Sequence, residues 1–152
     1  MMPEIVEPNW WEFRFKGKQP DRRGYHSSFI FDKKLYVFGG KDIGIGQLKS
    51  LWCIDLSELD DFVPGESEFS LNPEWYELNT TGTRPPAISH HTSLVYQNKM
   101  FLFGGSTRDQ ENTNFYQLDL TKNQWQVVKA KALHGDQTNF PKTRDEHSCV
   151  LQ

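Results

Sequence analysis

The chain has 152 residues, and its 17 basic against 20 acidic side chains give a net charge of −3, which argues against a nucleic-acid partner and against an anionic membrane surface. No apolar run reaches the roughly 18 residues that indicate a membrane span, and residues 1–7 lack the basic and apolar character of a signal peptide. We therefore expect a cytoplasmic protein that binds no membrane, with the nucleus as the alternative compartment.

Short segments rich in aromatic and β-branched residues predict strands along the whole chain. In chain order they are residues 10–13, 27–31, 35–38, 51–56, 75–78, 92–96, 100–103, 115–120, 125–128 and 148–151. The segments 35–38 and 100–103 lie 65 positions apart, and each consists of four large apolar residues followed by two glycines. Because neither segment alternates with polar residues, we expect other sheets to cover both faces. The glycines should let the chain leave where a side chain would collide.

Further features repeat in register with the double glycine. A proline precedes a histidine by six residues in three places, a tryptophan opens three strands, and an aspartate ends two others: Pro20 with His26, Pro85 with His91, Pro141 with His147; Trp10, Trp75 and Trp125; Asp55 and Asp119. Short polar links at 32–34 and 97–99 suit tight hairpins. The sequence therefore predicts repeated four-stranded units.

With these features the chain resembles the kelch repeat family. Arg23 and Arg144 stand midway between the proline and the histidine, whereas Ile88 occupies that position in the second copy. The resemblance covers nearly the whole chain and implies an all-β fold, a partial kelch-type β-propeller built of four-stranded antiparallel blades.

The repeats divide the chain into four parts. Residues 1–19 supply the last strand of a preceding blade, 20–80 form a first full repeat, 81–130 a second, and 131–152 start a third. The first repeat carries an insertion at 57–73 with Glu58, Asp60, Asp61, Glu66 and Glu68, which we expect to be a mobile acidic loop. A closed ring needs about 4–8 blades, so we expect an open fragment of a larger ring, completed by the rest of the same protein or by another chain.

Alternate turns of an up-and-down blade lie at opposite ends of its strands, which assigns each loop to one of two faces. One face, with the links 41–50, 106–114, 15–25, 79–90 and 129–146, carries twelve basic and seven acidic residues, and the other carries four and nine. We infer that an acidic peptide segment of a protein partner docks on the basic face. The candidate binding residues are Arg22, Arg23, Lys41, Lys49, Arg84, Arg108 and Arg144. In the alternative interpretation, Arg23 and Arg144 are structural and the lysines are only solvated.

The sequence offers no catalytic constellation, metal motif or cofactor motif. His26, His91 and His147 share one repeat position and are better explained as structural hydrogen-bonding residues. The two repeated aspartates are expected to cap turns, and Cys53 and Cys149 are expected to be small buried residues rather than a disulfide.

Two classes of function remain. The kelch resemblance implies a protein–protein interaction scaffold, as an adaptor or as a structural subunit of an assembly. Because some kelch-like propellers are oxidases, lyases or epimerases or are fused to phosphatases, the alternative is part of an enzyme whose catalytic residues lie outside this chain.

Overall fold

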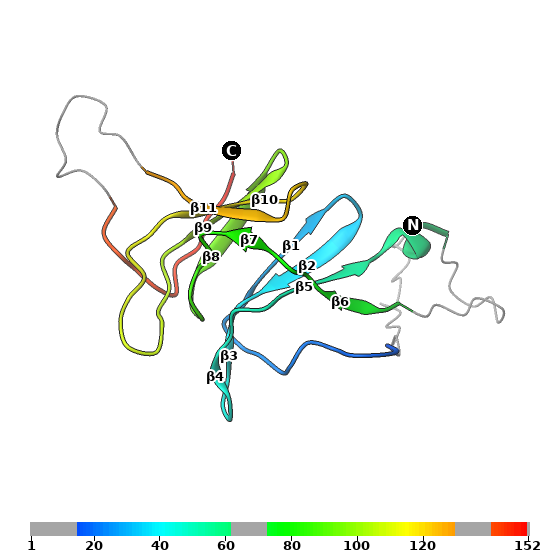
Figure 1. Ribbon diagram of the computed structural model, residues 1–152, viewed down its shortest axis with the longest axis horizontal. Coiled ribbons are helices and arrows are strands. Elements are labelled where there is room, and N and C mark those ends of the chain that lie inside the picture. The colour runs from blue at the N-terminus through cyan, green and yellow to red at the C-terminus, as the bar shows by residue number, and fades with distance from the viewer. Residues whose placement is uncertain (1–14, 62–72, 130–140, 152) are drawn as a thin grey trace, which may run out of the picture.

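The computed structural model describes residues 15–61, 73–129 and 141–151. Two antiparallel sheets lie side by side in Figure 1, and each corresponds to one of the two full repeats. The first sheet has the order β1-β2-β5-β6, with β1 at Ser27–Phe31, β2 at Lys34–Phe38, β5 at Leu51–Asp55 and β6 at Trp75–Glu77. The order confirms the predicted four-stranded blade.

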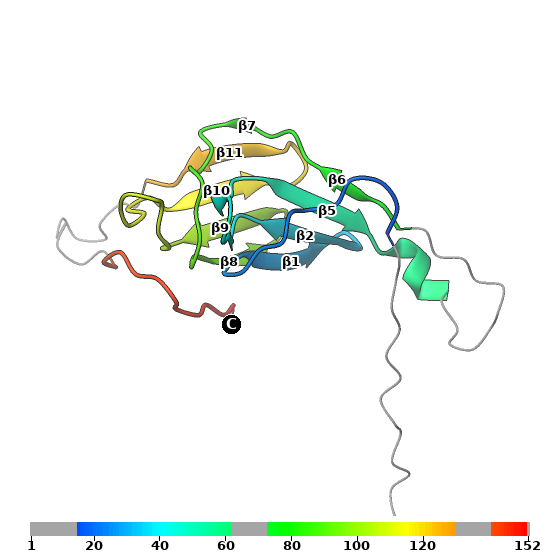
Figure 2. The ribbon, with the colours of Figure 1, turned by 90° about the horizontal axis from the view of Figure 1, so that it is seen from below.

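The second sheet repeats this arrangement and adds one strand. Its order is β7-β11-β10-β9-β8, with β7 at Thr81–Gly82, β8 at Thr92–Tyr96, β9 at Lys99–Phe103, β10 at Tyr116–Asp119 and β11 at Gln124–Val127. The innermost strands β1 and β8 contact each other, and Figure 2 shows β1 and β8 at the same edge of their sheets with β7 beyond β11. Both sheets therefore run from an inner to an outer strand in the same sense.

The core lies between the two sheets. Phe38, at 1% exposure, packs with its ring centroid 5.0 Å from that of Trp125, which is 2% exposed. Met100, Leu102 and Leu118 of the second sheet are fully buried in the same cluster. A large aromatic residue from each sheet thus fills the space between blades, which accounts for the apolar character of the strands on both faces.

The link between the blades takes a path that the sequence did not predict. After β6 the chain runs along the outer edge of the second sheet, where β7 pairs in parallel with β11. In the same way Lys16 pairs in parallel with Glu74 beside β6. The Lys18 ammonium lies 2.9 Å from a carboxylate oxygen of Glu77. The expected placement on the basic face is therefore wrong for Lys16, which lies beside the start of β6, at the other end of the blade. Lys18 lies beside the end of β6, where it lines a groove together with Lys49.

The predicted strand at 148–151 and the predicted burial of the two cysteines were only partly confirmed. No strand forms at 148–151, where the backbone pairs with no neighbouring strand among the described residues. Cys53 is buried and Cys149 is exposed, both as free thiols, so burial was predicted correctly for Cys53 and wrongly for Cys149. The missing strand leaves Cys149 without a neighbouring strand to cover it.

The start of the insertion forms the 3-10 helix η1, Ser57–Asp61. The rest of the predicted acidic loop, 62–72, and the predicted strand 10–13 lie outside the described residues. Within the described part of the chain, no helix has the length and apolar character needed to cross a membrane.

Candidate functional site

The loops that meet at one end of the two blades form what we call the loop face. There the Gly40 amide donates to the Ile88 carbonyl at 2.8 Å, and the Gly105 amide donates to the Arg144 carbonyl at 2.8 Å. At the opposite end, the Leu56 amide donates to the carbonyl of Lys33. These bonds confirm that the link from the second to the third strand shares its face with the lead-in of the following blade.

The double glycines permit this close approach between blades. Gly39 has a φ of 64°, and a β-carbon there would lie 2.7 Å from the Ile88 carbonyl oxygen and 2.9 Å from Cε1 of His91. In the second repeat, a β-carbon on Gly104 would collide with the Arg144 carbonyl oxygen and lie 2.5 Å from Cε1 of His147. No side chain fits at these positions, as the sequence predicted.

The repeated histidines hold one blade against the next. Nε2 of His91 lies 2.9 Å from Oγ of Ser27, and Nε2 of His147 lies 2.8 Å from Oγ1 of Thr92. His91 is 5% exposed, and burial lowers its pKa to about 4, so the ring is neutral near pH 7. The structural interpretation holds for these two residues, although the partner is a hydroxyl of the preceding blade. Among the described residues, no group of three or more His, Cys, Asp or Glu could hold a metal ion.

A column of three residues joins the blades at their inner edge. Tyr25, His90 and Glu146 each lie one residue before a repeated histidine, and their φ values are 55°, 60° and 52°. The His90 amide donates to the Tyr25 carbonyl at 3.0 Å, and the Glu146 amide donates to the His90 carbonyl at 3.1 Å. The rings of Tyr25 and His90 stack with centroids 3.9 Å apart. Sequence reasoning missed this column, although its constant spacing from the repeated proline was a usable signal.

The side chain of Arg23, one of the candidate binding residues, makes hydrogen bonds within the blade. Its Nη1 donates to the Gly39 carbonyl at 3.1 Å and to Oγ of Ser50 at 3.3 Å, and its Nε donates to the Asp21 carbonyl at 3.0 Å. The side chain is half-buried, and desolvation lowers its pKa. Arg23 therefore braces the loop between β2 and β5, which favours the structural alternative for this residue.

Three other candidates come together around the same loop. Gly24 and Lys41 exchange backbone hydrogen bonds at 3.0 and 2.9 Å, and Arg23 bonds to Ser50 next to Lys49. The exposed side chains of Arg22, Lys41 and Lys49 thus lie on segments that meet, and we call these three residues the basic cluster. No acidic side chain among the described residues forms an ion pair with any of them.

The remaining candidates lie on other segments. Arg84 follows β7, Arg108 lies in the loop between β9 and β10, and both are exposed. The Arg144 guanidinium is 6.0 Å from the centroid of the Phe103 ring. The structure therefore does not gather the seven candidates into one site.

A groove of about 540 Å³ adjoins the basic cluster. Lys49 lines it together with Trp52 and with Lys18, whose ammonium lies 5.1 Å from the centroid of the Trp52 ring and bonds to Glu77. Pro86 and Ala87 line the groove from the second blade's lead-in, and Asp21 lines it from the first. The groove therefore lies between the two repeats.

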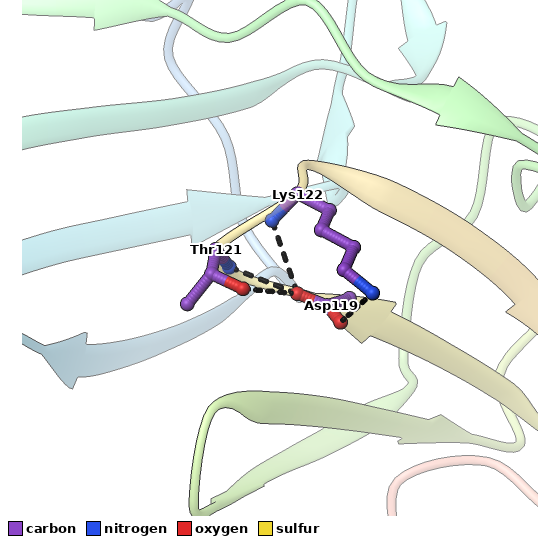
Figure 3. A network of polar contacts seen from close by, with 3 residues as sticks. All are labelled: Asp119, Thr121 and Lys122. Carbon is purple, nitrogen blue, oxygen red and sulfur yellow. Dashed lines mark hydrogen bonds and ion pairs between the residues drawn. The ribbon is translucent and has the colours of Figure 1, made fainter.

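The repeated aspartates cap turns on the opposite face, as predicted. Oδ1 of Asp119 accepts hydrogen bonds from the amide of Thr121 at 3.1 Å, its hydroxyl at 2.7 Å and the amide of Lys122 at 3.0 Å (Figure 3). In the first repeat, Oδ1 of Asp55 accepts from the Ser57 amide at 2.9 Å. These bonds, above all those from the Thr121 and Ser57 side chains, lower the pKa of both carboxyl groups.

The chain is similar in sequence to parts of several longer proteins. The chain is 25% identical to the leucine-zipper-like transcriptional regulator 1 homolog of Drosophila melanogaster over 93% of its own length and 13% of that protein. It is 28% identical to human host cell factor 2, over 89% of this chain and 18% of the relative. It is 26% identical to acyl-CoA-binding domain-containing protein 5 of Arabidopsis thaliana, over 93% of this chain and 19% of that protein. The chain thus spans less than a fifth of the length of these relatives.

The family comparison covers nearly the whole chain. The family model of the KLHDC2/KLHL20/DRC7 Kelch-repeats domain matches residues 2–152. The repeated double glycine, the interblade histidine and the four-stranded blades are the structural counterpart of that match. This chain belongs to the KLHDC2/KLHL20/DRC7 kelch-repeats domain family and forms part of a kelch β-propeller.

Proposed function

We propose that this chain is part of a protein-interaction module and that its loop face docks an acidic segment of a protein partner. The observation that supports this most is the basic cluster: three exposed cations on converging segments, without an acidic partner among the described residues. A structural role does not require unpaired cations at this place, since Arg23 alone braces the loop.

The groove beside the cluster provides the surface for such a segment. Lys49, the buried Trp52 and the lead-in residues Pro86 and Ala87 line it. Asp21 and Glu77 line it as well, and Glu77 is paired with Lys18. An extended chain in the groove would place carboxylates near the cluster, where they replace water as partners of the cations. The module then acts as an adaptor or assembly subunit in the cytoplasm, with no chemistry of its own.

A charge-reversal experiment tests this proposal with the full-length protein. The probe is a fluorescein-labelled decaglutamate peptide, and its fluorescence anisotropy is measured at low and at moderate salt. The variant R22E/K41E/K49E should bind the peptide about tenfold more weakly at low salt, because exposed ion pairs contribute roughly 0.2–1 kcal/mol each. Salt should weaken binding to the wild-type protein and have little effect on the variant.

The matched control reverses three cations on the opposite face, K34E/K99E/K122E, which lie in or beside strands and turns away from the loops. This control should bind the peptide almost as the wild-type protein does. An equal loss of peptide affinity in both variants would show that net charge alone attracts the peptide. The proposed docking site would then be abandoned.

A further inference from the structure

The β3–β4 hairpin exposes two large apolar side chains at its tip. β3 is Lys41–Asp42 and β4 is Gly46–Gln47. Ile43 is fully exposed, at 103%, and Ile45 is 64% exposed. Figure 1 shows the hairpin extending beyond both sheets. A single exposed isoleucine is unremarkable, but two on one projecting tip form a local apolar patch.

The hairpin is ordered by its own contacts. Oδ1 of Asp42 accepts hydrogen bonds from the amides of Gly44 at 2.7 Å and Ile45 at 3.1 Å, which fixes the turn. At the base, Leu48 is buried, its amide donates to the Gly40 carbonyl at 2.8 Å, and its carbonyl accepts from the Ile88 amide at 3.0 Å. The tip is therefore held in one conformation before any partner binds, which lowers the entropic cost of binding.

The equivalent loop of the second repeat shows that the fold does not require this tip. There the Thr107 hydroxyl oxygen accepts hydrogen bonds from the amides of Asp109 and Gln110, and the buried Asn112 side chain donates to the Gly104 carbonyl at 2.9 Å. The exposed residues of that loop are polar or charged: Arg108, Asp109, Gln110 and Glu111. A polar tip closes the same connection, so the isoleucines do not serve the closure of the loop.

We propose that Ile43 and Ile45 are an anchor that enters an apolar pocket of a folded protein partner, and that carboxylates at the rim of this pocket face Lys41 and Lys49. The proposal rests on the proposed function and specifies the partner's surface. A convex apolar tip fits a concave apolar pocket, and buried aliphatic anchors surrounded by a polar rim are typical of protein interfaces. The two lysines are exposed at the base of the hairpin, which sets the charge of the rim.

Insertion of the tip into an anionic bilayer is the competing use of such a loop. The chain's net charge of −3 opposes it, and Asp42 next to the tip would have to approach anionic headgroups. A pocket in a protein can place its carboxylates opposite the lysines and away from Asp42, which a uniformly anionic surface cannot do.

The test places a photoreactive p-benzoylphenylalanine at position 43 of the full-length protein and irradiates it in extract of its source cells. The matched control carries the same residue at Gln110, which is exposed in the equivalent loop of the second repeat. We expect an adduct from position 43 with a yield at least fivefold above that from position 110. Mass spectrometry should map the adduct to apolar residues flanked by Asp or Glu on the partner.

Capture of a protein alone does not support the proposal. The purified partner must also bind Ile43→Ser about tenfold or more weakly than the wild-type protein, since removal of a buried isoleucine forfeits its hydrophobic contribution. Gln110→Ser should leave this affinity unchanged. Any of four results would overturn the proposed anchor. They are the absence of an adduct, an adduct with a second copy of this chain, a mapped site without acidic residues, and Ile43-dependent binding to vesicles of phosphatidylcholine and phosphatidylserine.

The two proposals fail separately. Ile43→Ser should bind decaglutamate as the wild-type protein does, because the basic cluster is intact in this variant. Loss of decaglutamate binding only in R22E/K41E/K49E, together with no adduct from position 43, would retain the docking face and remove the anchor. An adduct at an acidic-rimmed pocket without any decaglutamate binding would retain the anchor and remove the docking face.

Discussion

The two repeats have the same scaffold and different loops. Gly39 and Gly104 both follow the second strand at positive φ, and Asp55 and Asp119 both cap the turn after the third. Trp75 and Trp125 occupy equivalent register positions at the start of the fourth strand, opposite Ile54 and Leu118. Between these shared positions, the first repeat has a hairpin with an apolar tip and the second a polar turn built on Thr107. The positions that join blades thus recur because the geometry between blades recurs, whereas the loops are free to differ and carry recognition.

The largest expected effect concerns the two tryptophans. Trp125 is 2% exposed between Phe38 and Tyr116, so Trp125→Ala should cost about 3–5 kcal/mol of unfolding free energy. Trp75 is half-buried here and touches Phe15, with ring centroids 6.0 Å apart. In a closed ring a preceding blade would cover it, and Trp75→Ala should then cost about as much as Trp125→Ala.

Urea denaturation of the full-length variants distinguishes these cases. A Trp75→Ala cost of only about 1 kcal/mol would fit a partly exposed side chain and show that no blade packs there. The Trp125→Ala cost serves as the internal reference for a tryptophan covered by a neighbouring blade.

The double glycine should give the next largest effect. Gly39→Ala combines a positive φ with a contact of 2.7 Å to the Ile88 carbonyl oxygen, and we expect a loss of about 2–4 kcal/mol. Gly24→Ala is the control, because nothing lies within 4 Å of a β-carbon there and its φ is not positive. The two substitutions are compared by their urea midpoints, and similar midpoints would contradict the close approach of the blades.

The interblade histidine predicts a dependence of stability on pH. Burial lowers the pKa of His91 to about 4 in the folded protein, so the unfolded state binds the extra proton between about pH 6.5 and pH 4. Stability is therefore full above pH 6.5 and falls as the pH decreases through this window. The expected loss from His91 is about 2 kcal/mol between pH 7 and pH 4.5.

Thermal unfolding across this pH range measures the effect. His91→Gln should have a lower unfolding temperature at pH 7 and a shallower pH profile than the wild-type protein, because the glutamine does not titrate. Parallel profiles would mean that other groups, such as His26 and His147, whose pKa values burial also lowers, dominate the acid response.

The smallest effect should separate the two aspartate turns. Oδ1 of Asp119 accepts three hydrogen bonds from two residues, Thr121 and Lys122, whereas the hydrogen bonds to Asp55 come from one residue, Ser57, through its amide and its side chain. Asp119→Ala should therefore lower the unfolding temperature more than Asp55→Ala, although both side chains lie in surface turns. The lowered pKa of both carboxyl groups places their contribution above about pH 4 and removes it below.

The sequence by itself determined the eight strands that make up the two full repeats, the sheet order within each repeat, the face on which each tight loop lies and the family. Strand residues are marked locally, by runs such as 35–38 and by the glycines and aspartates that end them, and a repeated pattern reinforces each assignment. The basic cluster was contained in the candidate binding residues because its members lie in loops of one face.

Only the tertiary structure decided the path of the links, the partners of Arg23 and His91, the Tyr25–His90–Glu146 column and the exposure of Ile43. Each depends on contacts between residues far apart in the chain or on the course of irregular backbone. The backbone of such segments bonds to whichever neighbouring strand edge or carbonyl is free in the folded protein. No local pattern of residues predicts which one that is.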